Sequence, residues 1–131
     1  MEFRYIPAGE FLMGIKERTQ VDDITKIKQY IVNIPYDYWV ARFPVTNELY
    51  NEYVISKGTR HPVDGWEHKR NHPVVRVRRK DAMAYCKWLN GQIQNSEFKS
   101  RNLEIRLPVE VEWEKSCARN RWKAVSLGKA V

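Results

Sequence analysis

The sequence predicts an α+β domain in which strands come first and helices follow. Two observations carry this prediction. Residues 3–43 contain segments with strand-like alternation, whereas apolar residues recur at helical spacing around residues 49–54, 82–89 and 109–117. The chain of 131 residues is long enough for one domain with a core, and a hydrophobic content of 43% with five Trp is typical of globular proteins.

The N-terminal third is expected to supply the strands. Residues 3–6 alternate in the strand period, and Pro7–Gly9 turns the chain into a second strand at 10–14, which together predict an N-terminal hairpin. Residues 15–28 are polar and are expected to form a loop. Two further strands are predicted at residues 30–34, ended by Pro35, and at 38–43.

The first predicted helix follows Pro44. Thr46 or Asn47 can cap it, because either side chain can accept a hydrogen bond from an unpaired backbone N–H. Gly58 is a suitable C-terminal stop. The apolar face of this helix consists of Leu49, Tyr50, Tyr53 and Val54.

A second helix is expected after an irregular segment at residues 59–71 and a short strand at 75–77. Asp81 caps or opens this helix, and Gly91 ends it. Its buried stripe is expected to contain Ala82, Tyr85, Cys86 and Leu89. Residues 92–102 form a polar excursion, and residues 103–107 are expected to form one more strand.

The last helix begins near Pro108, where a missing backbone N–H is harmless. Glu110, Glu112 and Glu114 favour the positive end of the helix dipole. Val109, Trp113 and Cys117 recur at i, i+4 and i+8, and we expect this stripe to face the core, with Trp113 buried.

Five motifs occur in order between residues 3 and 119. They are I-P-x-G-x-F-x-M-G at 6–14, V-T-N at 45–47 with Tyr50 and Tyr53, H-P-V at 72–74, D-A-x-A-Y-C-x-W at 81–88, and R-L-P-x-E-x-E-W-E at 106–114. The ordered set resembles the formylglycine-generating enzyme, or sulfatase-modifying factor, family. The resemblance implies an α+β fold related to C-type lectins and incomplete at its C-terminus. Residues 1–120 would be the N-terminal part of such a domain, and 121–131 a loose basic tail.

The sequence departs from the family pattern at several positions. Arg78 and Arg79 stand where the family usually has Ser-Trp, and Val109 replaces a hydroxyl residue that would cap the last helix. The copper-binding cysteine pair, the calcium sites and most of the substrate groove of the family would lie in the missing half. The resemblance therefore assigns no catalytic, cofactor-binding or metal-binding residue to this chain.

Three groups of residues could in principle carry a binding or catalytic function. His61, His68 and His72 match no familiar metal motif, and turn or surface histidines are the simpler interpretation. Glu110, Glu112 and Glu114 could supply a carboxylate pair for acid–base chemistry, with Glu110 and Glu114 on one helix face, but a first turn favoured by the helix dipole is the simpler interpretation. The basic stretch at residues 76–80, with Trp66 and Trp88 nearby, could contact nucleic acid, although a charged edge strand is simpler.

Two cysteines, Cys86 and Cys117, are expected to be buried reduced thiols. No segment approaches the roughly 20 apolar residues of a membrane span, and no signal peptide is recognisable, which favours a cytoplasmic protein without a membrane partner. The net charge of +7 is spread over the chain outside residues 76–80.

Two classes of function remain. The first is a non-catalytic, truncated module of this family that acts in protein binding or scaffolding and is completed by another chain or by self-association. The alternative is part of a copper-dependent formylglycine-generating oxidase, which converts a substrate cysteine to formylglycine. The missing half favours the first class for this chain alone.

Overall fold

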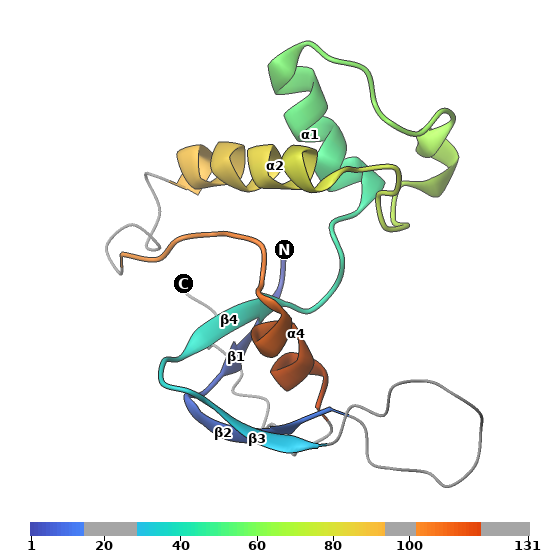
Figure 1. The fold of residues 1–131 in the computed structure, drawn as a ribbon. Coiled ribbons are helices and arrows are strands. Elements are labelled where there is room, and N and C mark those ends of the chain that lie inside the picture. Colours follow the sequence, from blue (N-terminus) through green and yellow to red (C-terminus); the bar gives the residue numbers. More distant parts are fainter. Residues whose placement is uncertain (15–28, 94–101, 119–131) are drawn as a thin grey trace, which may run out of the picture. The chain divides into compact units, whose positions relative to one another are not determined.

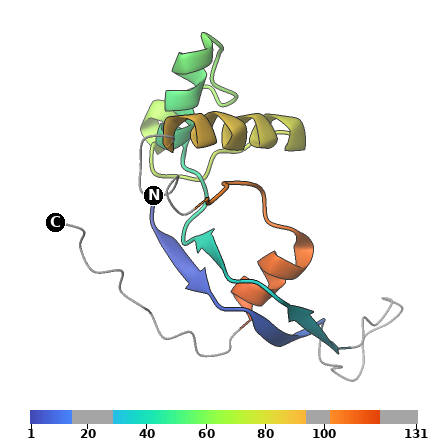
Figure 2. The same cartoon turned by 90° about the vertical axis from the view of Figure 1, so that its left-hand side faces the viewer.

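The computed structural model describes residues 1–14, 29–93 and 102–118 (Figures 1 and 2). The contacts divide the chain into two compact units, which we describe separately. Unit 1 comprises Met1–Arg42 and the chain from Pro108 onward, and unit 2 comprises Phe43–Leu107. Unit 1 contains paired strands and one helix, whereas unit 2 is helical, so the predicted mixture of strands and helices is confirmed.

The strands of unit 1 form a long two-stranded ribbon (Figure 2). Strand β1 (Phe3–Ile6) pairs antiparallel with β4 (Tyr38–Ala41), and β2 (Gly9–Met13) pairs antiparallel with β3 (Tyr30–Ile34). The expected hairpin between the first two strands is therefore wrong, because β1 and β2 follow one another along the same arm of the ribbon.

Prolines interrupt the ribbon in its middle. Ile6 faces Tyr38 and Gly9 faces Ile34, so two residues on one arm, 7 and 8, lie opposite three on the other, 35–37. Pro7 and Pro35 lack the N–H that a continuous ladder requires. The Asp37 carboxylate accepts a hydrogen bond from the Ala8 N–H at 2.7 Å and fixes this bend.

The core of unit 1 lies on one face of the β2–β3 ladder. Phe11, Met13 and Ile34 are buried there, whereas Leu12 and Ile31, paired on the opposite face, are exposed. Helix α4 (Glu110–Cys117) packs against this core through Val111, and Ala118, its C-cap, packs there too.

The orientation of α4 contradicts the sequence-based expectation. Trp113 is 59% exposed and Val109 is 49% exposed, and Cys117 is exposed as well. The residues that α4 buries are Glu112 and Lys115, with exposed fractions of 2% and 1%. The expected apolar stripe faces outward because charged side chains on the other face reach backbone and hydroxyl partners in the ribbon.

The N-terminus of α4 bears out one expectation. Val109 is the N-cap and makes no side-chain capping bond. The Glu112 carboxylate still accepts a hydrogen bond from the Val109 N–H at 2.9 Å, so half of a capping box is present.

Unit 2 contains helices α1 (Asn47–Lys57) and α2 (Arg79–Gln92) and a 3₁₀ turn, η1 (Trp66–Lys69). Thr46 is the N-cap of α1, where its hydroxyl accepts from the Leu49 N–H at 3.3 Å. Gly58 ends α1 in the left-handed region at φ 61°, where an L side chain would be strained. Both predicted helix boundaries are confirmed.

Aromatic rings hold α1 and α2 together. Tyr50 and Val54 of α1 and Tyr85 of α2 are buried, and the rings of Tyr50 and Tyr85 stack with centroids 5.4 Å apart. Tyr53 and Trp88 extend this cluster with a centroid distance of 5.6 Å. Helix α2 begins two residues before Asp81, whose carboxylate lies in the first turn and accepts the Arg78 N–H at 3.2 Å.

The segments that carry V-T-N and H-P-V pair with each other. Thr46 and Pro73 form an isolated antiparallel bridge, and the Val74 N–H donates to the Val45 carbonyl at 2.9 Å. The Asn47 side chain donates to the Lys69 carbonyl at 2.9 Å. These bonds tie the start of α1 to residues 69–74.

Two predicted strands in unit 2 are absent from the described residues. At 75–77 the chain is irregular, because Arg76 has a φ of 59° that no strand accommodates. Residues 103–107 find no partner strand, and instead the Asn90 side chain bonds both the N–H and the carbonyl of Ile105, at 2.8 and 2.7 Å.

Some expectations concern residues that the structure does not describe. Three expected segments lie wholly or mostly outside the described residues: the loop at 15–28, the polar segment at 92–102 and the tail at 121–131. Of the polar segment, the structure describes only residues 92, 93 and 102. In the part that is described, no helix is long and apolar enough to cross a membrane.

Candidate functional site

Lys115 and Glu112 attach α4 to the ribbon of unit 1. The Lys115 ammonium donates to the carbonyls of Pro7 and Gly9, at 2.7 and 2.8 Å, beside the bend. Burial lowers the pKa of Lys115 from its ordinary value, and the nearby Asp37 carboxylate opposes this shift. The ammonium is therefore committed to the fold and is not available to a ligand.

Two tyrosines of the β3–β4 arm hold Glu112. The Tyr36 hydroxyl donates to the Glu112 carboxylate at 2.9 Å, and the Tyr38 hydroxyl donates to the Glu112 carbonyl at 2.7 Å. Burial and the Glu112 charge raise the pKa of Tyr38 to about 12. Glu114 accepts a hydrogen bond from the Gly14 N–H. Both carboxylates thus help to position α4. Of the two residues considered as an acid–base pair, Glu114 makes this bond to the ribbon and Glu110 is exposed in the first turn of α4.

These anchors leave an apolar surface on the other side of the helix, which we call the outer α4 face. It consists of Val109, Trp113 and Cys117, the residues expected to be buried. They come from the R-L-P-x-E-x-E-W-E motif and the turn that follows it. An exposed indole beside a valine and a thiol is typical of a surface that another polypeptide covers.

The two cysteines are free thiols with different surroundings. Cys86 lies half-buried in unit 2, where burial raises the pKa of its thiol, whereas Cys117 is exposed in unit 1. The expectation of two buried thiols is therefore wrong for Cys117, because α4 turns its apolar stripe outward. No group of three or more His, Cys, Asp or Glu residues suitable for a metal ion occurs in the described ranges.

The three histidines differ in their surroundings. His68 and His72 are exposed, whereas His61 is only 9% exposed. The ring of His61 stacks on Trp66 with centroids 5.0 Å apart and an interplanar angle of 26°. Tyr50 meets the same ring edge-on at 6.0 Å.

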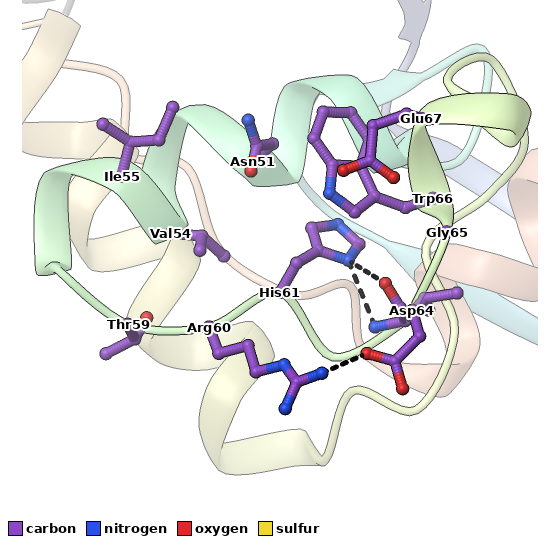
Figure 3. Close-up of a pocket in the computed structure, with 11 residues that line it drawn as sticks. Asn51, Val54, Ile55, Thr59, Arg60, His61, Asp64, Gly65, Trp66 and Glu67 are labelled. Atoms are coloured by element: carbon purple, nitrogen blue, oxygen red, sulfur yellow. Dashed lines mark hydrogen bonds and ion pairs between the residues drawn. The ribbon is translucent and has the colours of Figure 1, made fainter.

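A cavity of about 390 Å³ opens beside His61 in unit 2 (Figure 3). It lies between the C-terminal half of α1 and the segment that leads into η1. Its lining combines the His61 and Trp66 rings with aliphatic and charged side chains, among them Val54, Arg60 and Glu67. The expectation that His61 is a turn or surface residue is therefore wrong, because its ring is enclosed by Trp66 and Tyr50.

The basic stretch at residues 76–80 is exposed at the start of α2. Arg79 and Lys80 occupy the first turn, where cations are disfavoured by the helix dipole. Trp66 and Trp88, which we considered as a stacking surface for bases, lie against His61 and Tyr85 instead.

Comparison with known proteins adds to these observations. A family model for the sulfatase-modifying factor enzyme 1-like domain matches residues 2–127. The chain is similar to hercynine oxygenase from Mycolicibacterium smegmatis, at 25% identity. The alignment is 145 positions long and covers 86% of this chain and 30% of that protein. It is also similar to formylglycine-generating enzyme from Mus musculus, at 42% identity over 50 residues that cover 38% of this chain and 10% of that protein.

The chain spans less than a third of the length of either relative. The family match nevertheless covers nearly all of its residues, including every motif that the sequence analysis singled out. The resemblance is thereby confirmed, and this chain belongs to the sulfatase-modifying factor enzyme 1-like, or FGE-sulfatase, family.

Proposed function

We propose that this chain is a non-catalytic, protein-binding part of an FGE-like domain, and that the outer α4 face is its docking surface. The observation that carries the proposal is the 59% exposure of Trp113 on a helix whose opposite face is fixed by buried charges. Tryptophan is enriched among the residues that dominate binding energy in protein interfaces, because it buries a large area at a low entropic cost.

The occupant that we propose is the polypeptide that completes an FGE-like domain. Hercynine oxygenase and formylglycine-generating enzyme both extend far beyond the region that this chain matches, which covers 30% and 10% of their lengths. Such a segment, in the same polypeptide or in another chain, would bury the outer α4 face. In this proposal the chain forms the N-terminal part of a C-type-lectin-related fold, and the protein works in the cytoplasm.

Co-expression tests this proposal. The chain is produced together with the part of mouse formylglycine-generating enzyme that follows the aligned segment, as a separate polypeptide. We expect the two to co-elute as a one-to-one complex in size-exclusion chromatography with light scattering. The substitution Trp113→Glu should abolish the complex, because it places a charge at the centre of an apolar contact.

Met83→Glu is the matched control, because Met83 is a helix residue of similar exposure, 53%, in the other unit. It should leave the complex intact. Separate elution of the wild-type polypeptides, or a complex that survives Trp113→Glu, would contradict the proposal. A homodimer of the chain that Trp113→Glu dissociates would show that the occupant is a second copy.

The name of one relative, formylglycine-generating enzyme, favours a second proposal. In it the chain is part of an oxidase that converts a substrate cysteine to formylglycine, and the family resemblance implies that copper is its cofactor. Mass spectrometry of a Cys-x-Pro-x-Arg peptide, incubated with Cu(I), oxygen and either the chain alone or the complex, separates the two proposals. The docking proposal predicts no formylglycine from the chain alone. Formylglycine produced by the complex would establish the chain as part of an oxidase, and formylglycine produced by the chain alone would also contradict the non-catalytic proposal.

A further inference from the structure

We propose that the His61 cavity of unit 2 binds an amide carbonyl carried by a cationic molecule, as in a short basic peptide. Nothing in the family match or in the names of the relatives assigns a role to this cavity. It lies within one unit, between residues 51 and 67, and so does not depend on the docking surface of α4.

The tautomer of His61 follows from its contacts with Val63. The ring Nδ1 lies 3.1 Å from the Val63 N–H and 3.2 Å from the Val63 carbonyl (Figure 3). The two contacts require opposite protonation of Nδ1, and a backbone N–H can only donate. We therefore assign Nδ1 as the acceptor of this bond, which leaves the proton of the neutral ring on Nε2.

The Nε2 atom is buried and has no hydrogen-bond partner. A buried donor without an acceptor is unfavourable, and most such groups in proteins are paired with protein, water or a ligand. His61 is nine-tenths buried and lies in the wall of the cavity. Its stacking partner Trp66 is only half-buried and follows Gly65, which has a left-handed φ of 66°. Because Nε2 is covered in this structure, binding of an acceptor oxygen requires a neighbouring side chain to move.

The charges around the cavity select the acceptor. Arg60 and Asp64 neutralise each other in an ion pair of 2.8 Å, visible as a dashed line in Figure 3. Glu67 also lines the cavity, and the described residues offer it no ion pair. The lining therefore carries a net negative charge, which opposes a carboxylate ligand and favours a neutral carbonyl attached to a cation.

The cavity volume of about 390 Å³ lies at the lower end of the range of small-molecule sites. Val54 and Ile55 supply an aliphatic wall, and the two stacked rings supply an aromatic one. An amide group with a short side chain fits this mixture of surfaces.

Imidazole NMR on the full chain tests the proposal. The probe is acetyl-glycyl-lysine amide, with acetyl-glycyl-glutamate as its anionic counterpart. The nitrogen signals of His61 are those that remain when the exposed His68 and His72 are both replaced by Gln. We expect the lysine peptide to move the His61 Nε2 signal saturably, and the glutamate peptide to leave it unchanged.

Glu67→Gln removes the charge that selects the cation and should weaken the lysine peptide about two- to fivefold, as expected for an exposed ion pair. The matched control is Glu52→Gln, an equal charge change at an exposed α1 residue that does not line the cavity. Three results would overturn the proposal and leave water as the occupant. They are a His61 signal that the lysine peptide does not move, equal responses to the two peptides, and equal effects of the two substitutions.

Discussion

Helix α4 of unit 1 lies on its ribbon through buried charged groups, whereas α1 and α2 of unit 2 pack through aromatic rings. In unit 2 the buried residues of each helix follow the apolar period of the sequence. In unit 1 the apolar period marks the exposed face instead, because Lys115 and Glu112 have partners in the ribbon. The comparison shows that a helix of this size can be oriented by directional hydrogen bonds rather than by its apolar stripe.

The largest expected effect concerns the aromatic core of unit 2. Tyr85→Ala should lower the free energy of unfolding by about 3–5 kcal/mol, because a buried aromatic side chain leaves a cavity between α1 and α2. Denaturant unfolding measures the loss, and amide hydrogen exchange locates it in unit 2. Met83→Ala, at an exposed position on the same helix, should change stability by no more than about 0.5 kcal/mol. Equal losses for both variants would contradict the aromatic core.

The next effect concerns the charged anchor of unit 1. Lys115→Met keeps the length of the side chain but leaves the carbonyls of Pro7 and Gly9 unpaired, which should cost about 1–3 kcal/mol. Lys87→Met, on the exposed side of α2, removes the same charge and should be nearly neutral. If Lys115→Met were as stable as the wild type, the anchor would contribute nothing to the position of α4.

A third effect appears only at alkaline pH, and each unit contributes to it. Burial raises the pKa of Tyr38 and of Tyr85 to about 12. The negative charge of Glu112 adds to the shift of Tyr38, and that of Glu52 adds to the shift of Tyr85. Between pH 10 and 12 the unfolded chain loses these phenolic protons while the folded chain keeps them. The free energy of unfolding should therefore fall as pH rises through this window, and be unaffected below pH 10.

Absorbance titration of the phenolate band tests this directly. Tyr38→Phe and Tyr85→Phe should each remove one titration step near pH 12. Titration of all seven tyrosines near pH 10 would show that neither phenol is buried in solution.

The smallest expected effect belongs to Trp113, which the sequence analysis predicted to be buried. Trp113→Ala should change the free energy of unfolding by no more than about 0.5 kcal/mol, because the indole is exposed. A loss of about 3–5 kcal/mol, typical of a buried tryptophan, would instead show that α4 turns its apolar stripe inward. Denaturant midpoints of the variant and the wild type decide between these outcomes.

The parts of the fold that could be predicted depend on neighbours in the sequence. Thr46 and Gly58 set the two ends of α1 through hydrogen bonds to residues within one turn. The spacing of Tyr50 and Val54 identifies the buried face of this helix. The family motifs could be recognised in the same way, because each is a contiguous segment.

The features that could not be predicted depend on distant partners. A hydrophobic pattern places Lys115 on the exposed side of a helix because its side chain is charged. Its hydrogen-bond acceptors, however, lie 108 and 106 residues away at the proline bend. The pairing of β1 with β4 is likewise set by a register that local alternation does not reveal. His61 gave no signal beyond its neighbours, because its burial results from Trp66 and Tyr50 closing over it.

The orientation of α4 is tested most directly by the reactivity of the two thiols in the native chain. With a thiol-specific reagent at neutral pH, we expect one fast reaction, which Cys117→Ser removes, and one slow reaction, which Cys86→Ser removes. Cys117 is exposed on the outer α4 face, whereas Cys86 is half-buried with a raised thiol pKa. A Cys117 that reacts as slowly as Cys86, and becomes fast only on unfolding, would contradict the outward orientation of Trp113 and with it the proposed docking surface.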